Sequence, residues 1–459
     1  MIQFIFEFAS RFSRFLVTLM RHQRGSVLVL WAFAAVPVVL GVGTVVDVSR
    51  AYMAKSRLAF SLDAAGLAAG AAGSTEAEIK SIAEQYFFAN YTADSPGTPS
   101  TPTVTVDGGV IAISGSVTIE TTIMQLVGQG EITVVASAEI LRKGLEVALI
   151  LDNTGSMAGS KLESLRDASQ DLVDILFQVP ELQANLKVGI VPYSASVNVG
   201  SIAPGIVTAA HAATYDPTDN ESWSGCVLGR SYPNDVQDIP FSAGNEWPRY
   251  LWDSASDNVW PVVKDNPSFC NNSTGPNLGC PTPIVPLTAN KDTLDAAVGA
   301  MAAWCRGGTF SNLGMIWGWR VLSPEAPFSE GLPYQTPGYD KVAILMTDGV
   351  NGYYTPPGSA FSADYAGYGR LHDGALGTTN KGVATTIMNN RLSEVCNNMK
   401  AEGIIIYTVT FQLNNSNTKQ IYENCASDTD KYFDSGNGTA LQNAFKDIAE
   451  QLINLRVSK

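Results

Sequence analysis

The chain has 459 residues, a net charge of −14 and 16% charged residues. This length accommodates about two or three domains, and the acidic balance argues against nucleic acid as a partner. The sequence has three histidines and no Cys-x-x-Cys pair, and the run from Gly155 to Gly159 places its serine one position too early for a nucleophile elbow. The sequence therefore lacks the residue patterns that zinc binding and serine catalysis require, and no enzymatic activity is expected.

Residues 25–46 carry no charge and are long enough to cross a membrane as a helix. Four arginines precede this segment, against one glutamate (Arg11, Arg14, Arg21, Arg24 and Glu7). The positive-inside rule therefore predicts a cytoplasmic N-terminus over residues 1–24 and export of the rest of the chain. A cleaved secretory signal is the alternative, but the apolar run exceeds a usual signal core and no close small-x-small site follows it. We expect a retained transmembrane anchor.

Residues 47–92 are predicted to continue as a stalk helix, since alanine, leucine and charged residues dominate them. The Ala- and Gly-rich stretch 64–73 allows either the close approach of another helix or a break. Residues 93–143 begin with a linker rich in Thr, Ser and Pro and continue with strand-like runs at 103–106, 110–113, 117–123 and 132–138. Asp107-Gly108-Gly109 is a hairpin signal between the first two runs. We expect a small β-rich module here.

Residues 144–459 alternate apolar runs with helical patterns. The strand-like runs are 147–151, 187–191, 341–347 and 403–411, and a closing helix is expected at 441–455. Continuous apolar strands alternating with helices predict an α/β fold with a doubly wound, mostly parallel sheet.

An insertion at about 200–286 interrupts this pattern. It contains four tryptophans (Trp223, Trp247, Trp252 and Trp260) and three of the six cysteines. Either these aromatic side chains pack a disulfide-stapled core, which is the more frequent outcome, or they form an exposed partner surface.

All six cysteines follow the apolar segment, as expected for disulfides formed on the exported side (Cys226, Cys270, Cys280, Cys305, Cys396 and Cys425). The sequence does not choose among their pairings. Closeness in the sequence favours Cys270–Cys280 and Cys396–Cys425, which would leave Cys226 with Cys305.

Oxygen-bearing side chains follow two of the apolar runs and one glycine-rich loop. Asp152, Thr154 and Ser156 come at the end of the first run, Asp348 follows the run 341–347, and Thr309 lies in the loop 307–314. Ligands usually bind at the carboxyl ends of parallel strands. Hard oxygen donors suit Mg²⁺, with Mn²⁺ or Ca²⁺ as alternatives. Taken singly, each residue could instead be a helix N-cap or a turn former.

The pattern Asp152-x-Thr154-x-Ser156, followed by the later loop and by Asp348, resembles the metal-ion-dependent adhesion site of von Willebrand factor A domains. The resemblance implies that Thr154 and Ser156 bind the ion directly and that Thr309 binds it directly or through water. Asp152 and Asp348 would complete the shell, and a partner's carboxylate would take an open position. A second insertion, 351–379, follows Asp348 and is expected to cover or flank the ion.

Most of the chain resembles TadG-like proteins of the tight-adherence (Flp) pilus apparatus. The similar segments are Arg24-Gly-Ser, Asp47-Val-Ser-Arg-Ala-Tyr, Asp152-Asn-Thr-Gly-Ser-Met, Gly307-Gly-Thr, Trp317-Gly-Trp-Arg and Thr347-Asp-Gly. The resemblance implies a single-pass protein of the bacterial inner membrane whose C-terminal domain is periplasmic or extracellular. Its partners would be other Tad pilus components or a host-surface ligand that presents a carboxylate. Leu30 stands where pilins of this apparatus carry glutamate, which favours an uncut anchor.

Two other functions remain open. The domain could be a metal-independent structural spacer of the pilus machinery. It could also resemble the A-domain subunit of a chelatase or AAA⁺ system, although export would separate it from a cytosolic ATPase.

Overall fold

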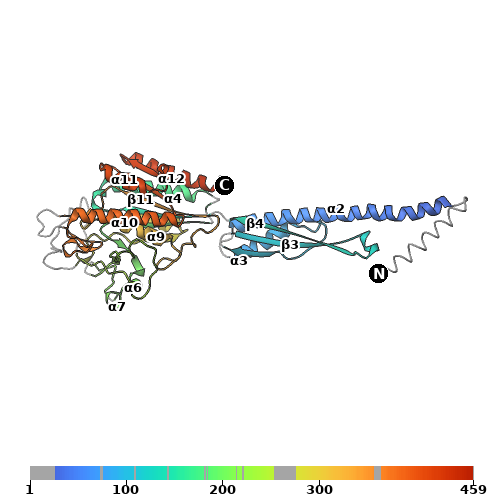
Figure 1. The fold of residues 1–459 in the computed structure, drawn as a ribbon, viewed down its shortest axis with the longest axis horizontal. Coiled ribbons are helices and arrows are strands. Elements are labelled where there is room, and N and C mark those ends of the chain that lie inside the picture. The colour runs from blue at the N-terminus through green and yellow to red at the C-terminus, as the bar shows by residue number, and fades with distance from the viewer. Residues whose placement is uncertain are drawn as a thin grey trace. The chain divides into compact units, whose positions relative to one another are not determined.

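The computed structural model describes residues 26–72, 76–107, 110–141, 144–179, 182, 185–212, 214–219, 222–252, 275–355 and 363–457. It divides into two compact units, Met1–Ile140 and Leu141–Lys459 (Figure 1). One hydrophobic core lies within the first unit, and the second unit contains separate cores of its own. Trp260 and Cys270, for which packing and a disulfide were predicted, lie outside the described residues.

The first unit combines two helices with a small sheet. Its elements are α2 (Ser26–Ala72), α3 (Glu76–Asn90), β1 (Thr98–Pro99), β2 (Thr103–Asp107), β3 (Val110–Glu120), the 3-10 turn η1 (Met124–Val127) and β4 (Glu131–Leu141). β1 and β2 pair antiparallel with β3, and β4 also pairs with β3. Within the described part of the chain, one helical stretch, Leu30–Ala71, is long and apolar enough to cross a membrane. This helix is consistent with a single-pass membrane anchor.

The helix expected over 47–92 is divided into two, because α2 ends at Ala72 and α3 begins at Glu76, so the break that the Ala- and Gly-rich stretch 64–73 allowed occurs at the end of that stretch. Both helices contribute to one core with the sheet, through residues that include Leu62 of α2, Phe87 of α3 and Ile113 of β3. An unbroken helix of this length would extend about 70 Å and carry the apolar face of α3 away from that sheet. Burial of this face therefore explains why the chain forms two helices.

The second unit is built on an eight-stranded sheet with the order β16-β15-β11-β5-β6-β7-β8 and with β9 paired to β6. The strands are β5 (Gly144–Asp152), β6 (Leu186–Tyr193), β7 (Val197–Asn198), β8 (Cys226–Val227), β9 (Val285–Thr288), β11 (Tyr339–Thr347), β15 (Ile405–Phe411) and β16 (Tyr432–Ser435). The pairs between β16, β15, β11, β5 and β6 are parallel, whereas β7, β8 and β9 pair antiparallel. The expected α/β fold with a mostly parallel sheet is confirmed at this level.

Helices lie on both faces of this sheet. Alternate residues of β5 enter two separate cores, which the helices α4 (Ser160–Phe177) and α12 (Gly438–Val457) complete on one face and α9 (Ser311–Leu322) and α10 (Lys381–Ala401) on the other (Figure 1). α9 approaches the sheet closely, since a Cβ on Gly318 would lie 2.2 Å from the side chain of Ile150. α8 (Lys291–Ala300) and α11 (Ser416–Cys425) are further helices of this unit.

The remaining elements are short. They are η2 (Gly155–Met157), η3 (Gly200–Ile202), α6 (Ala203–Ile206), α7 (Ala209–Ala212), η4 (Gly275–Asn277), β10 (Gly308–Thr309), β12 (Gly352–Tyr353), β13 (Tyr365–Ala366), β14 (Gly369–Arg370), η5 (Leu371–Asp373) and η6 (Thr429–Lys431). β10 pairs antiparallel with β12, and β13 pairs antiparallel with β14.

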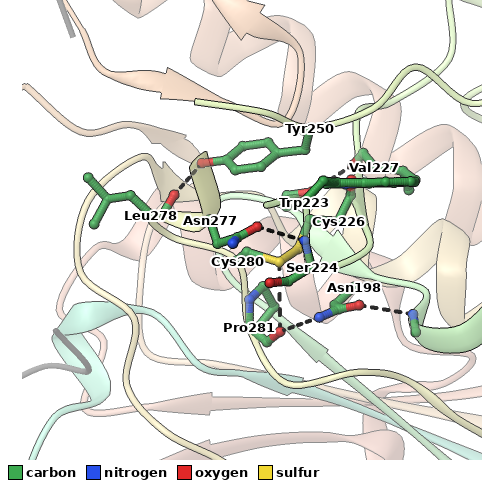
Figure 2. Close-up of a disulfide and its surroundings, with 12 residues drawn as sticks. Asn198, Trp223, Ser224, Cys226, Val227, Tyr250, Asn277, Leu278, Cys280 and Pro281 are labelled. Carbon is green, nitrogen blue, oxygen red and sulfur yellow. Dashed lines mark hydrogen bonds between the residues drawn. A yellow bond between two sulfur atoms is a disulfide. The ribbon is translucent and has the colours of Figure 1, made fainter. Parts of the chain in front are cut away.

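The structure confirms one expected disulfide, Cys396–Cys425, and corrects the others, because Cys226 is bonded to Cys280. Cys305 is also disulfide-bonded. Sequence closeness fails for Cys226 because this residue lies in β8, which pairs with Asn198 of β7, and Asn198 also bridges to the segment after Cys280 (Figure 2). The expected pairs Cys270–Cys280 and Cys226–Cys305 are therefore wrong.

The described tryptophans of the large insertion are buried rather than exposed. Trp223 belongs to the main core, and its indole nitrogen donates to the carbonyl of Cys226 (Figure 2). Trp247 packs against Trp317 of α9, with ring centroids 5.1 Å apart and ring planes inclined by 41°. Trp252 packs with the Cys226–Cys280 disulfide in a small separate core. All three side chains therefore pack in cores rather than forming an exposed surface, but only Trp252 packs in the disulfide-stapled core that the packing interpretation predicted.

Candidate metal centre

Asp152 ends β5, and its side chain is fully buried at the carboxyl end of the sheet. One carboxylate oxygen accepts from the backbone nitrogen of Thr154 at 2.8 Å and from the Thr154 hydroxyl at 2.6 Å. The other oxygen accepts from the hydroxyl of Thr347 at 2.7 Å, which comes from the end of β11. These bonds fix the loop after β5 and join it to the neighbouring strand.

Ser156 connects this loop to Asp348. Its Oγ lies 3.0 Å from the hydroxyl of Thr154 and donates to one oxygen of Asp348 at 2.6 Å. The second oxygen of Asp348 accepts from Nζ of Lys161 at 2.6 Å. The two carboxylates and two hydroxyls therefore form one continuous chain of contacts that ends at a lysine ammonium.

Thr309 approaches the same place from a third loop. A Cβ built on Gly349 would lie 3.4 Å from Thr309 Oγ1 and 4.0 Å from Ser156 Oγ, so both hydroxyls border the turn after β11. Thr309 belongs to β10, and its register partner in β12 is Gly352. The second insertion thus flanks the candidate site through β12.

The loop that holds Thr309 has an unusual backbone. Arg306, Gly307 and Gly308 all have positive φ, of 79°, 77° and 126°. A Cβ on Gly308 would lie 2.1 Å from the carbonyl oxygen of Gly352, so only glycine fits there. Asp364 stabilises the turn, since it pairs with the Arg306 guanidinium at 2.6 and 2.7 Å and accepts from the nitrogen of Gly307 at 3.2 Å.

Burial and the nearby charge of Asp348 raise the pKa of Asp152 to about 7. The three hydrogen bonds from Thr154 and Thr347 act in the opposite direction, but they do not offset the loss of hydration. The charged form of Asp152 is therefore costly, and a nearby cation would stabilise it.

The structure brings all five predicted residues to one edge of the sheet. Lys161 and Asp364 had no predicted role, although both contact the site or its loops directly. Lys161 carried a signal, because a cation in the first turn of a helix opposes the helix dipole and indicates a partner. Asp364 carried none, since it lies 55 residues after Thr309 in an insertion without regular pattern.

The side chains gathered here offer oxygen atoms, which are the donors that hard cations prefer. Among the described residues no group of three or more His, Cys, Asp and Glu side chains gathers at a metal-binding spacing. A metal at this edge would therefore depend on the hydroxyls of Thr154, Ser156 and Thr309 as well as on the carboxylates. Such an all-oxygen donor set fits Mg²⁺, Mn²⁺ or Ca²⁺.

Comparisons with known proteins return pilus adhesins among the similar structures. The von Willebrand domain of the type V pili tip protein Mfa5 from Porphyromonas gingivalis matches with a TM-score of 0.37 and 12% identity, over 69% of this chain and 97% of that chain. The pilus adhesin SpaC from Lactobacillus rhamnosus GG matches with a TM-score of 0.36 and 12% identity, over 77% of this chain and 34% of that chain. The pilus adhesin RrgA from Streptococcus pneumoniae matches with a TM-score of 0.35 and 11% identity, over 78% and 49%.

No curated protein matches the sequence. A family model does match the N-terminal part of the chain, where the anchor helix and the segment Asp47-Val-Ser-Arg-Ala-Tyr lie. Residues 25–72 match the family described as "Putative Flp pilus-assembly TadE/G-like", in agreement with the resemblance to the Flp pilus apparatus.

Proposed function

We propose that this protein acts in Flp pilus assembly or adhesion, and that residues 144–459 are a von Willebrand A-type domain with a doubly wound sheet. In this proposal Asp152, Thr154, Ser156, Thr309 and Asp348 bind one divalent cation, with Mg²⁺ as the first candidate. The ion would present an open coordination position to a carboxylate on another pilus component or on a surface ligand. The protein would be anchored in the bacterial inner membrane with its N-terminus cytoplasmic, and it would have no catalytic role.

The observation that carries the ion proposal is the position of Ser156. Its hydroxyl lies between Thr154 Oγ1 and Asp348 Oδ1, at 3.0 and 2.6 Å, although Asp348 is 192 residues away in the chain. Hydroxyl and carboxylate oxygens this close to one another can share one cation. Lys161 supplies the positive charge beside Asp348. Because lysine has a long flexible stem, its ammonium can leave when a metal enters.

The test is isothermal titration of Mg²⁺, Mn²⁺ and Ca²⁺ into the purified oxidised chain and into Asp348→Asn. Asp434→Asn is a matched control, since Asp434 belongs to β16, an edge strand of the same sheet that is separated from β11 by β15, and also pairs with a lysine, Lys419, at 2.6 Å. We expect saturable binding in the wild type and the control, and loss of binding in Asp348→Asn. Equal binding by all three proteins would show that this site is not the ion site.

A metal-independent spacer is the second candidate, and the Lys161–Asp348 ion pair favours it. The pair neutralises Asp348 without any metal, at a nitrogen–oxygen distance of 2.6 Å. A spacer would bind its partner equally well in chelator and in Mg²⁺. Partner capture from pilus components in the two conditions separates this candidate from the ion-dependent one.

A further inference from the structure

The loop between β3 and β4, residues 121–130, contains no charged residue and carries the segment Ile123-Met124-Gln125-Leu126-Val127, which is apolar except for Gln125. Leu126 and Val127 are 72% and 63% exposed. The loop lies in the first unit, as α2 does. In Figure 1 it extends beyond the sheet along α2.

Asp47 of α2 holds this loop in place. Its buried carboxylate accepts hydrogen bonds from the backbone nitrogens of Thr122, Ile123 and Met124, each at 2.9 Å. Arg50, one turn further along the helix, donates to the Thr122 hydroxyl at 2.9 Å. Three backbone donors on one carboxylate fix the loop more firmly than an exposed ion pair would.

The contact with α2 fixes the depth of the loop. Gly43 is buried by the side chain of Ile123, whose atoms would lie 2.2 to 2.5 Å from a Cβ at that position. Gly43 belongs to the uncharged segment 25–46, about 6 Å before Asp47 along the helix axis. If α2 spans a bilayer over that segment, the loop lies at the depth of its last turn.

We infer that residues 123–127 form a membrane-contacting tip, which inserts Leu126 and Val127 into the lipid leaflet nearest Asp47. The transfer of exposed leucine and valine side chains from water into lipid lowers the free energy, and the loop carries no charge that lipid would have to accommodate. The occupant is the phospholipid bilayer that surrounds α2 itself. This second contact would fix the depth and tilt of the first unit on the membrane, beyond what a single helix can do.

The test uses the full chain in phospholipid nanodiscs, with a cysteine introduced at position 126 and labelled with the fluorophore NBD. Leu126→Cys suits this purpose because Leu126 is exposed and no cysteine among the described residues is free. Val135→Cys in β4 is the matched control, since Val135 is 66% exposed and lies along the sheet away from the loop. Quenching by doxyl-labelled lipid and by aqueous iodide is measured at both positions.

We expect lipid quenching several-fold stronger at position 126 than at position 135, and iodide quenching several-fold weaker. Equal lipid and iodide quenching of the probes at 126 and 135 would overturn the inference. That result is also expected if a protein, rather than lipid, covers the loop in the cell. Asp47→Ala should shift the 126 probe toward the behaviour of the control, whereas Asp63→Ala, an exposed acid on the same helix, should not. Unchanged quenching in Asp47→Ala, with the 135 probe also unchanged, would exclude the tether.

Discussion

Replacing Asp152 with asparagine should stabilise the metal-free second unit and abolish its stabilisation by Mg²⁺. The asparagine carbonyl can accept the two hydrogen bonds that Thr154 donates, at 2.8 and 2.6 Å. The amide group can donate to Thr347 Oγ1, which lies 2.7 Å from the replaced oxygen. The Thr347 hydroxyl can then turn its own hydrogen toward the carbonyl of Gly349, at 3.4 Å. The substitution therefore removes the charge and keeps the hydrogen bonds.

The magnitude follows from the cost of the buried charge. Burial, together with Asp348, raises the pKa of Asp152 from 3.8 to about 7 in the folded protein. At about 1.36 kcal/mol per pKa unit, the ionised carboxylate lowers the free energy of unfolding by about 4 kcal/mol at alkaline pH. Because the folded-state pKa is the raised one, this penalty is absent below about pH 4 and is complete above about pH 7. Asparagine has no such penalty at any pH.

The assay is urea denaturation of residues 141–459 in chelator, from about pH 4 to about pH 8, for the wild type and Asp152→Asn. The free energy of unfolding of Asp152→Asn should increase relative to that of the wild type as the pH rises, and Asp434→Asn should show no comparable increase. With Mg²⁺ at about 100 times its dissociation constant, the wild type should gain about 2.7 kcal/mol and Asp152→Asn nothing. A difference that stays constant with pH, or a wild type that is more stable than the variant at alkaline pH, would refute the reasoning.

Three further predictions concern the site and its supports. Lys161→Met should bind Mg²⁺ more tightly than the wild type in a titration, because no ammonium competes for Asp348; weaker binding would mean that the lysine helps to hold the site together. Gly308→Ala should lower the free energy of unfolding by about 1–3 kcal/mol or more in urea denaturation, since its Cβ would meet the Gly352 carbonyl, and Mg²⁺ binding should weaken with it. Cys226→Ser should lower the free energy of unfolding by about 4 kcal/mol in the same assay, because the Cys226–Cys280 disulfide closes a long loop. A reduced wild type that is as stable as the oxidised wild type would contradict this.

The parallel strands of the second unit can be predicted from sequence because both of their faces are buried. Every residue of β5 is buried, and residues 147–151 of the strand form a continuous apolar run in the sequence. The short strand β16 lacks this signature, since Tyr432, Phe433 and Asp434 are all partly or fully exposed. The antiparallel strands β7, β8 and β9 escape prediction for another reason. They are two to four residues long, and their positions depend on pairing between segments that a long insertion separates in the sequence.

The candidate site was predictable where each oxygen donor follows a recognisable strand or glycine-rich loop. Asp152 and Asp348 meet because β5 and β11 are adjacent parallel strands, which the sequence pattern favours. The supporting contacts were not predictable in the same way. The pairing of Arg306 with Asp364 depends on where an insertion folds back, and no local propensity records that position. The same limit explains why closeness in sequence gave the wrong partner for Cys226.

Two acidic residues that follow apolar segments differ in a way that only their hydrogen-bond partners reveal. Asp47 accepts from three backbone nitrogens, which the fold holds in place, so its carboxylate serves structure and no ion can displace those donors. Asp348 accepts from the hydroxyl of Ser156 and the ammonium of Lys161. A hydroxyl can rotate and a lysine stem can swing away at little cost, so a divalent cation can replace both contacts. Of these two acids, Asp348 is therefore the one at which to test for ion binding, because its partners are side chains that can move away.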